Sequence, residues 1–273
     1  MENQGQNTKI QTKEVRKWGN SGGILLPREW VGKQVKIQLI DHQGEIKKDV
    51  LKILEPWLEE IIGVYLVGSY ARNEQTKESD IDILVVSKNV KKVFGSGKYE
   101  IEMMPLKSLI SLLRIFPASI YPKIIDAKAI INSGLLEEIK EKVKITRGSM
   151  KPYVEDCKRK LKINKKLIKD DEKTGTYLKS YSVLYSLILR LRAFYFMNSI
   201  LKGKGHTNES FKNYLASEIG VGKEKIEEIY STYRLVARDK KVEYKIQLDL
   251  IKSMLNVLEK EVNEWDDKKK KEA

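Results

Sequence analysis

Two short apolar runs on either side of a polar loop constrain this chain more than any other feature. The first, "IIGVYLV", covers residues 61–67, and the second, "DIDILVVS", covers residues 80–87. Each run has the length of a buried strand, and a Gly-Ser pair directly after the first run marks a turn. We therefore expect two strands joined by the polar loop "GSYARNEQTKES".

Two aspartates, one residue apart, open the second strand. Because side chains alternate along a strand, Asp80 and Asp82 share one face, and the apolar side chains between and after them take the other. Two like charges side by side are unfavourable unless a cation neutralises them. Magnesium suits this position, because it binds carboxylate oxygens and completes its shell with water and phosphate oxygens. The pattern predicts a divalent cation site.

The turn after the first strand is suited to an anion. Gly68 allows a tight turn and a close approach to the backbone, while Ser69 offers a hydroxyl and backbone N–H groups where a helix would begin. Arg72, one turn later, can reach an anion held there. A lone Asp-x-Asp or a lone Gly-Ser turn is common by chance, so the prediction depends on their occurring together.

In combination, "GSYAR" and "SDIDILV" resemble the signature of the DNA polymerase β superfamily of nucleotidyltransferases, a Gly-Ser turn followed by Ser-Asp-x-Asp on a strand. The resemblance implies that superfamily's mixed-sheet fold and an NTP as donor substrate. It assigns nucleotide binding to Gly68, Ser69 and Arg72. One position departs from the signature, since Asn73 stands where the family usually has Gly. Asn tolerates a left-handed backbone better than most residues, so the expected fold is unaffected.

The resemblance also requires a third carboxylate from a neighbouring strand. "KYEIEMMP" supplies two candidates on one strand face, Glu100 and Glu102. Glu102 precedes the apolar "MMP" and the helix "LKSL" in the family's manner and is the preferred candidate, although a shift of two residues is easily made from sequence. Alternatively, both face solvent, and the site binds nucleotide without turning it over.

The activity implied is magnesium-dependent transfer of a nucleoside monophosphate from an NTP to a hydroxyl group, with Mg²⁺, or Mn²⁺ in its place, as cofactor. Asp80, Asp82 and Glu102 would hold two metal ions, one activating the acceptor hydroxyl and one bridging the triphosphate. The acceptor stays open between RNA, a protein hydroxyl and a small molecule, because members of the superfamily share the donor site and differ around it.

The first forty residues form a separate pattern of short, Gly-punctuated β segments. "EVRKWGNSGGILLPREWVGKQVKIQL" resembles the AbrB-like swapped-hairpin family, in which two copies intertwine into a dimeric barrel that commonly binds DNA. The resemblance implies a homodimer, because a unit of this size buries too little by itself. It makes Arg16, Lys17 and Arg28 candidates for DNA contact, although a basic strand edge can equally prevent edge pairing.

The rest of the chain divides by its periodicity. A helical stripe in "IKKDVLKILEPWLEEI" precedes the first buried strand, a third strand and helical segments follow, and beyond residue 150 only helical stripes occur. One of these helices, "NESFKNYLASEIG", has Asn208 as its expected N-cap. We expect an α+β chain with a small β unit at 1–44, a mixed-sheet nucleotidyltransferase domain at 45–149 and a helical bundle at 150–273.

Composition limits the function classes. The 273 residues carry a net charge of +14, which favours anionic partners such as nucleotides or nucleic acid. A single cysteine excludes an internal disulfide framework and cysteine-based zinc sites, and fits the cytoplasm. The longest apolar stretch, 181–201, contains Arg190 and Arg192, which favours a buried helix over a membrane span. Relatives of this superfamily also pair with helical HEPN proteins, whose nuclease motif is an Arg followed by a His a few residues later. His42 and His206 are the only histidines in the chain, so that motif is absent.

Two hypotheses from different classes follow. The first is an enzyme, a magnesium-dependent nucleotidyltransferase with an N-terminal dimerisation or DNA-binding unit. The second is a DNA-binding regulator or antitoxin-type module whose transferase-like domain binds nucleotide or a partner without turnover. Whether a carboxylate of the third strand meets Asp80 and Asp82 separates the two hypotheses.

Overall fold

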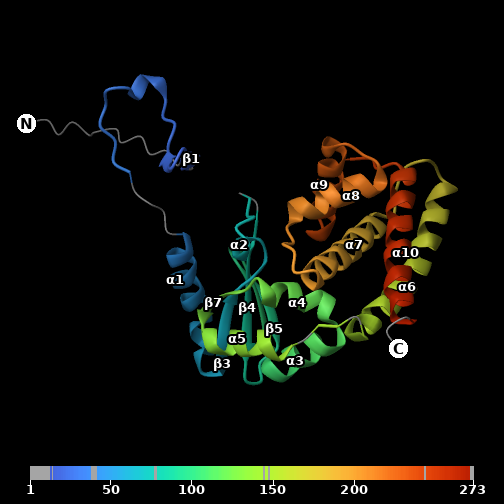
Figure 1. Ribbon diagram of the computed structural model, residues 1–273, viewed down its shortest axis with the longest axis horizontal. Helices are drawn as coiled ribbons and strands as arrows, with labels where there is room; N and C mark the ends of the chain where they lie inside the picture. The colour runs from blue at the N-terminus through green and yellow to red at the C-terminus, as the bar shows by residue number, and fades with distance from the viewer. Residues whose placement is uncertain are drawn as a thin grey trace, which may run out of the picture. The chain divides into compact units, whose positions relative to one another are not determined.

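The computed structural model of the protein is shown in Figure 1. It describes residues 13, 15–37, 42–76, 79–143, 145–146, 148–242 and 244–270. The chain forms two compact units, Met1–Lys48 and Asp49–Ala273. The sheet and the helical bundle expected from the sequence both lie in the second unit, so the candidate site is built within one unit.

The described residues of the N-terminal unit contain a single short hairpin. Strands β1 (Arg16–Trp18) and β2 (Ser21–Gly23) pair antiparallel, and a 3-10 turn, η1 (Arg28–Trp30), follows. The further strands expected after the hairpin are not formed, since 24–27 and 31–37 have no regular structure, and part of that expectation falls on 38–40, outside the described residues. A strand needs a neighbour to accept and donate its backbone hydrogen bonds, and one copy of this segment provides none.

The chain enters the sheet through a helix that proline ends. Helix α1 (His42–Leu54) passes into the 3-10 segment η2 (Glu55–Glu60), which has Pro56 in its first turn, and then into strand β3 (Ile61–Leu66). Proline has no N–H to donate to the preceding turn and clashes with an α-helical backbone before it, which explains why the expected helix stops early. The helix-then-strand order is as expected from the sequence.

A five-stranded mixed sheet forms the centre of the second unit, in the order β5-β6-β4-β3-β7. Its remaining strands are β4 (Ile81–Ser87), β5 (Lys92–Ser96), β6 (Tyr99–Pro105) and β7 (Lys128–Ile131). Strands β4 and β6 are parallel and the other pairs antiparallel. The sequence predicts the three inner strands but not β5 and β7, which are short edge strands without a long apolar run. The fold is α+β, as expected.

The two faces of the sheet have different neighbours. On one face, Leu84, Val86 and Met104 belong to the core that continues through the helices after β6 into the bundle. These helices are α3 (Leu106–Ile115), α4 (Pro117–Ile125) and α5 (Ser133–Lys142). The opposite face buries Ile81, Ile83, Val85 and Ile101. Asp80, Asp82, Glu100 and Glu102 follow the alternation of the first face, so the carboxylates lie on the side of the sheet that meets the bundle.

Five helices make up the bundle beyond residue 150. They are α6 (Lys151–Glu172), α7 (Tyr181–Leu201), α8 (Asn208–Ile219), α9 (Lys223–Ala237) and α10 (Leu248–Lys270). The long helices α6 and α10 run side by side (Figure 1). One detail of the prediction is wrong: Thr207, not Asn208, caps α8, because its side chain and that of Ser210 form a reciprocal capping box.

No single helix in the described part of the chain is long and apolar enough to cross a membrane. Helices α3 and α4 meet that measure of length and composition only as a pair, and the two are bent by 116° at their junction.

Candidate active site

The Gly-Ser turn and the second aspartate are built against each other. Strand β3 ends at an extended Val67, whose N–H donates to the carbonyl of Asp82 at 2.9 Å, and Gly68 then begins the short helix α2 (Gly68–Ala71) with a φ of +70°. A Cβ at residue 68 would overlap the Asp82 Oδ2 atom and lie 2.9 Å from its Cγ. Glycine is needed here both for the backbone angle and for the space that the Asp82 carboxylate fills.

Asp82 is the carboxylate with the most perturbed environment in the site. Its pKa is raised to about 6, mainly by burial and also by the acidic neighbours Glu100 and Asp80, against the opposing effect of Lys123 and Arg72. The register explains the influence of Glu100, since this residue pairs directly with Asp82 across the parallel strands β4 and β6. A buried carboxylate with two like charges beside it is a position that a bound cation would stabilise.

The raised pKa of Asp82 gives a pH-dependent cost that can be measured without metal. Its folded-state value of about 6 exceeds the ordinary 3.8, so between pH 4 and pH 6 the folded chain keeps a proton that the unfolded chain has released. The free energy of unfolding therefore falls as pH rises through this window, by about 3 kcal/mol for this group. With a chelator present, we expect the free energy of unfolding of Asp82→Asn to exceed that of wild type by this amount above pH 6. Urea denaturation at pH 4 and pH 7 measures the difference. A difference that does not change with pH would contradict the assignment.

The other two acidic candidates are bonded to basic side chains. Arg238 Nη2, just after α9, donates to Asp80 Oδ2 at 2.7 Å, and Lys123 Nζ on α4 donates to Glu102 Oε2 at 2.8 Å. Within the described residues, no three His, Cys, Asp or Glu side chains converge closely enough to hold a metal ion. Glu100 lies next to Asp82, whereas Glu102 pairs with Leu84, one pleat further along β6. The strand register therefore favours Glu100, the less preferred candidate from sequence, as the neighbour of Asp82.

The chemistry of this donor set nevertheless fits a hard divalent cation. Asp80, just before β4, shares this face with Asp82 on β4 and with Glu100 and Glu102 on β6, so the face carries four carboxylates. Burial and acidic neighbours raise the pKa of Asp82, an effect that a bound cation would relieve. Lys123 and Arg238 supply positive charge to the same carboxylates in this structure. The carboxylates are thus ligands of the type that magnesium prefers, and two of them, Asp80 and Glu102, are paired with basic side chains in this structure.

Arg72 is held in a polar cluster that joins the Gly-Ser turn to the bundle. Its Nε donates to Glu74 at 2.9 Å and its Nη1 to Asp126 at 3.4 Å, and only 14% of its side chain is exposed. His206 Nε2 lies 3.0 Å from the same Asp126 carboxylate, and the Asn208 backbone N–H donates to Glu74 at 3.0 Å. The guanidinium expected to face phosphate is thus engaged by two carboxylates that position the turn.

The sequence did not identify the partners of Arg72. Glu74, Asp126 and His206 belong to no motif, and the contacts of the cluster span up to 134 residues along the chain. The one signal available was the basic and polar run "KGKGHTNES" before α8, which is typical of a loop and gives no partner. The departure at Asn73 is accommodated as expected: the residue adopts a left-handed φ of 58°, and its Oδ1 accepts from Lys128 Nζ at 2.9 Å.

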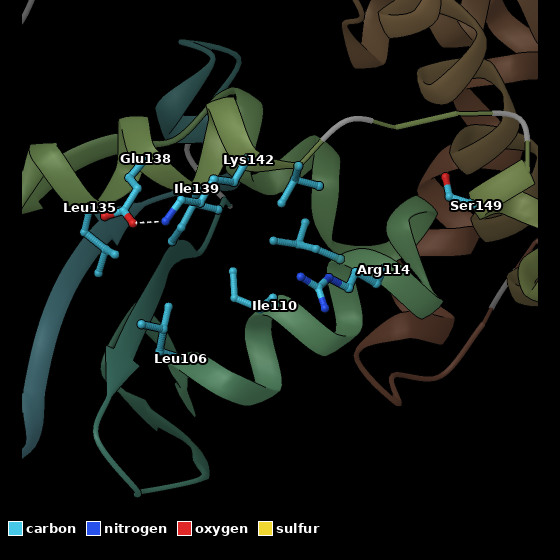
Figure 2. Close-up of a pocket in the computed structure, with 10 residues that line it drawn as sticks. Leu106, Ile110, Arg114, Leu135, Glu138, Ile139, Lys142 and Ser149 are labelled. Atoms are coloured by element: carbon cyan, nitrogen blue, oxygen red, sulfur yellow. Dashed lines mark hydrogen bonds and ion pairs between the residues drawn. The ribbon is translucent and has the colours of Figure 1, made fainter.

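A cavity of about 540 Å³ has none of these carboxylates in its lining, which Figure 2 shows. Its floor is apolar and comes mainly from α3 and α5, with Leu106, Ile110, Leu135 and Ile139 among the lining residues. The Glu138–Lys142 ion pair lies at its rim. None of the lining residues is a candidate site residue, so the cavity is separate from the phosphate turn and the carboxylates.

The candidate DNA-contacting residues lie in the N-terminal unit. Arg16 and Lys17 are on β1 and Arg28 is in η1, and all three are exposed. Exposure of basic side chains is compatible with phosphate contact and equally with an unpartnered strand edge. DNA binding by these residues stays a prediction.

Strand β3, the Gly68 turn and β4 all lie in a stretch of sequence that matches a family model. Residues 45–161 match the model of the nucleotidyltransferase domain. The similarity to this family concerns that part of the chain. In sequence, the chain is related to "Putative protein adenylyltransferase MJ0141" of Methanocaldococcus jannaschii, with 39% identity over 54 residues, which are 20% of this chain and 52% of the relative. The match spans about half the length of that relative. An AbrB-like N-terminal unit is not confirmed by these comparisons.

Two solved structures are similar to the chain as a whole at low identity. A nucleotidyltransferase-like protein from Exiguobacterium sibiricum 255-15 has 14% identity and a TM-score of 0.33, over 80% of this chain and 75% of its own. Spectinomycin adenyltransferase AAD(9) from Enterococcus faecialis, with ATP and spectinomycin, has 15% identity and a TM-score of 0.45, over 81% of this chain and 99% of its own.

Proposed function

We propose that this protein transfers a nucleoside monophosphate from an NTP to a hydroxyl group, with magnesium as cofactor. The observation that carries the proposal is the packing of the partly buried Asp82 carboxylate against Gly68, which puts a group that a cation would stabilise directly beside the turn of a nucleotidyltransferase domain. In the reaction, the acceptor oxygen forms a bond to the α-phosphorus, the bond from that phosphorus to the β-phosphate bridging oxygen breaks, and pyrophosphate leaves.

Different residues of the chain would bind the phosphates, hold the metal ion and accept the proton. The backbone N–H groups after Gly68 and the Ser69 hydroxyl would bind the β- and γ-phosphates, with Arg72 positioning this turn through Glu74 and Asp126. Asp80, Asp82 and a carboxylate of β6 would hold Mg²⁺, which when bound supplies charge neutralisation at the triphosphate and acidifies the acceptor hydroxyl. The β6 carboxylate, Glu100 or Glu102, would accept the proton that the hydroxyl releases.

We further propose ATP as donor and a protein hydroxyl as acceptor. The support is the 39% identity over 54 residues with a relative whose name describes a protein adenylyltransferase. The test is incubation of the chain with each NTP labelled at the α-phosphate, Mg²⁺ and cell extract, with γ-labelled ATP in parallel. Label from α-labelled ATP on a protein band, with none from γ-labelled ATP, is the expected result. Nucleotide binding without any label transfer would instead favour the regulator hypothesis.

The same assay decides which of the two β6 carboxylates belongs to the site. Glu100→Gln and Glu102→Gln are compared, because the register favours the first and the family signature the second. The variant that loses transfer identifies the third carboxylate of the site.

We infer that the N-terminal unit pairs with a second copy of the chain. None of the described residues from 13 to 37 is buried, and the unit exposes a set of large apolar side chains. They are Val15, Trp18, Leu25, Leu26, Val31, Val35 and Ile37. A segment with this many exposed apolar groups and no core of its own requires a partner surface.

Val31→Glu is expected to weaken that pairing. Val31 is 81% exposed in one chain, and burying a carboxylate in an apolar interface is costly. Wild type should sediment at twice the 31.6 kDa of one chain, and the variant should need at least about tenfold more protein to do so. Val93→Glu, at a valine 76% exposed on β5, is the matched control and should leave the dimer intact. A wild-type monomer at micromolar concentration would refute the inference.

A further inference from the structure

We propose that Arg238 is an internal counter-ion that closes the acidic site when no nucleotide is bound, and that it must leave Asp80 before that carboxylate can take a divalent cation. The inference rests on the proposed function, which it deepens with a regulatory contact. Arg238 donates from Nη2 to Asp80 Oδ2 at 2.7 Å, across 158 residues of sequence. It thereby links the end of α9 in the bundle to the start of β4 in the nucleotidyltransferase domain.

The backbone that carries Arg238 is fixed by the way α9 ends. The N–H of Lys240 donates to the carbonyl of Leu235 and the N–H of Asp239 to that of Val236, and Asp239 adopts a left-handed φ of 52°. This pair of bonds is the Schellman arrangement, which satisfies the last carbonyls of a helix and sets the direction of the chain beyond it. The guanidinium therefore extends from a defined point and not from a loose end.

The Arg238–Asp80 pair can nevertheless be exchanged. Both side chains are about one-third exposed, 34% for Arg238 and 38% for Asp80. An ion pair at this exposure changes an equilibrium constant by at most about fivefold, which the binding of a divalent cation to two carboxylates can exceed. Arg238 donates to one of the two carboxylate oxygens of Asp80, Oδ2, and places its positive charge against the group that a cation shared by Asp80 and Asp82 would bind. Because like charges repel at this short range, Arg238 and a cation at Asp80 compete for the carboxylate.

The Arg238 contact balances part of the negative charge in the site. The acidic side chains Asp80, Asp82, Glu100 and Glu102 lie on or just before two neighbouring strands, and Lys123 on α4 donates to Glu102. Arg238 provides positive charge on the Asp80 side, and it comes from the bundle and not from the sheet. Opening the Asp80 contact therefore couples occupation of the site to a change at the end of α9.

Manganese alone, without nucleotide, tests this exclusion. The dissociation constant of Mn²⁺ is measured by electron paramagnetic resonance for wild type, Arg238→Gln, Arg238→Lys and Arg234→Gln. Arg234→Gln removes the same charge one turn earlier on α9 and is the matched control for long-range electrostatics. We expect Arg238→Gln to bind Mn²⁺ about two- to fivefold more tightly than Arg234→Gln, on the scale of an exposed ion pair. Arg238→Lys, which keeps the charge, should stay within about twofold of wild type.

Asp82→Asn separates the failure of this inference from failure of the proposed function. If Mn²⁺ binds wild type, is lost in Asp82→Asn and binds Arg238→Gln no more tightly than Arg234→Gln, the role of Arg238 is refuted and the metal site stands. If Asp82→Asn binds Mn²⁺ as wild type does, or neither wild type nor Arg238→Gln binds it, both are refuted; binding by wild type with none by Arg238→Gln refutes the role of Arg238 alone. Circular dichroism of each variant confirms that it is folded, and Arg238→Lys supplies the comparison if Arg238→Gln is not.

Discussion

Asp82→Asn is expected to lower the rate of nucleotidyl transfer by about a thousandfold while leaving the fold more stable than wild type above pH 6. The loss in rate is on the scale of a single well-placed electrostatic group in a transition state. The gain in stability follows from the raised pKa of the buried carboxylate, whose charge is unfavourable in the folded chain. Asn keeps the size of Asp, so the packing against Gly68 is retained.

The prediction is discriminating because the transfer rate and the free energy of unfolding should change in opposite directions. A variant that lost activity by unfolding would lose both quantities together, whereas loss of a functional charge lowers the rate and raises the free energy of unfolding. Transfer of α-labelled ATP gives the first quantity and chemical denaturation in chelator the second. Asp170→Asn on α6, which makes the same chemical change at a carboxylate bonded to Lys173, should alter the rate by less than about twofold. Full transfer activity in Asp82→Asn would refute the site assignment.

The sequence predicts the part of this site that local structure determines. The turn at Gly68 and the shared face of Asp80 and Asp82 follow from a Gly-Ser pair and from strand alternation, both of which act over a few residues. The left-handed backbone at Asn73 is also a local effect, and it occurs as expected. Each of these features depends on neighbours in the chain, so the pattern of residues is sufficient to find them.

The sequence did not predict the contacts between segments that are far apart in the chain. The partner of Asp80 lies 158 residues away and that of Glu74 lies 134 residues away, and neither belongs to a motif with fixed spacing. Helix α4 was missed for a different reason: it contains Pro117 and Pro122, which argue against a helix, although Pro117 sits at its first position, where no N–H is needed. The choice between Glu100 and Glu102 depends on the register of β6 beside β4, which side-chain alternation alone leaves undetermined.

Gly68→Ala is expected to destabilise the fold by about 2–3 kcal/mol and to lower the transfer rate by at least about a hundredfold. About 1–2 kcal/mol comes from forcing a Cβ into a left-handed backbone conformation. The rest comes from overlap of that Cβ with the Asp82 carboxylate, which must move from its position beside the turn. A displacement of a catalytic group by about 1 Å is enough for a hundredfold loss of rate.

Gly97→Ala separates the backbone effect from the steric one. Gly97 in the β5–β6 turn has a φ of +58°, close to that of Gly68, but a Cβ there would meet no atom within 4 Å. It should therefore show only the backbone cost, about 1–2 kcal/mol, with transfer unchanged.

A double-mutant cycle then assigns the remainder of the Gly68 effect to Asp82. If the Cβ acts by displacing this carboxylate, Gly68→Ala should be less destabilising in an Asp82→Ala background, where the overlapping oxygen is absent. The expected coupling is about 1 kcal/mol, typical of residues in direct contact, measured by urea denaturation of the four proteins. Strict additivity would mean that the turn and the carboxylate are independent, and the packing of Asp82 against Gly68 could then no longer support the proposed function.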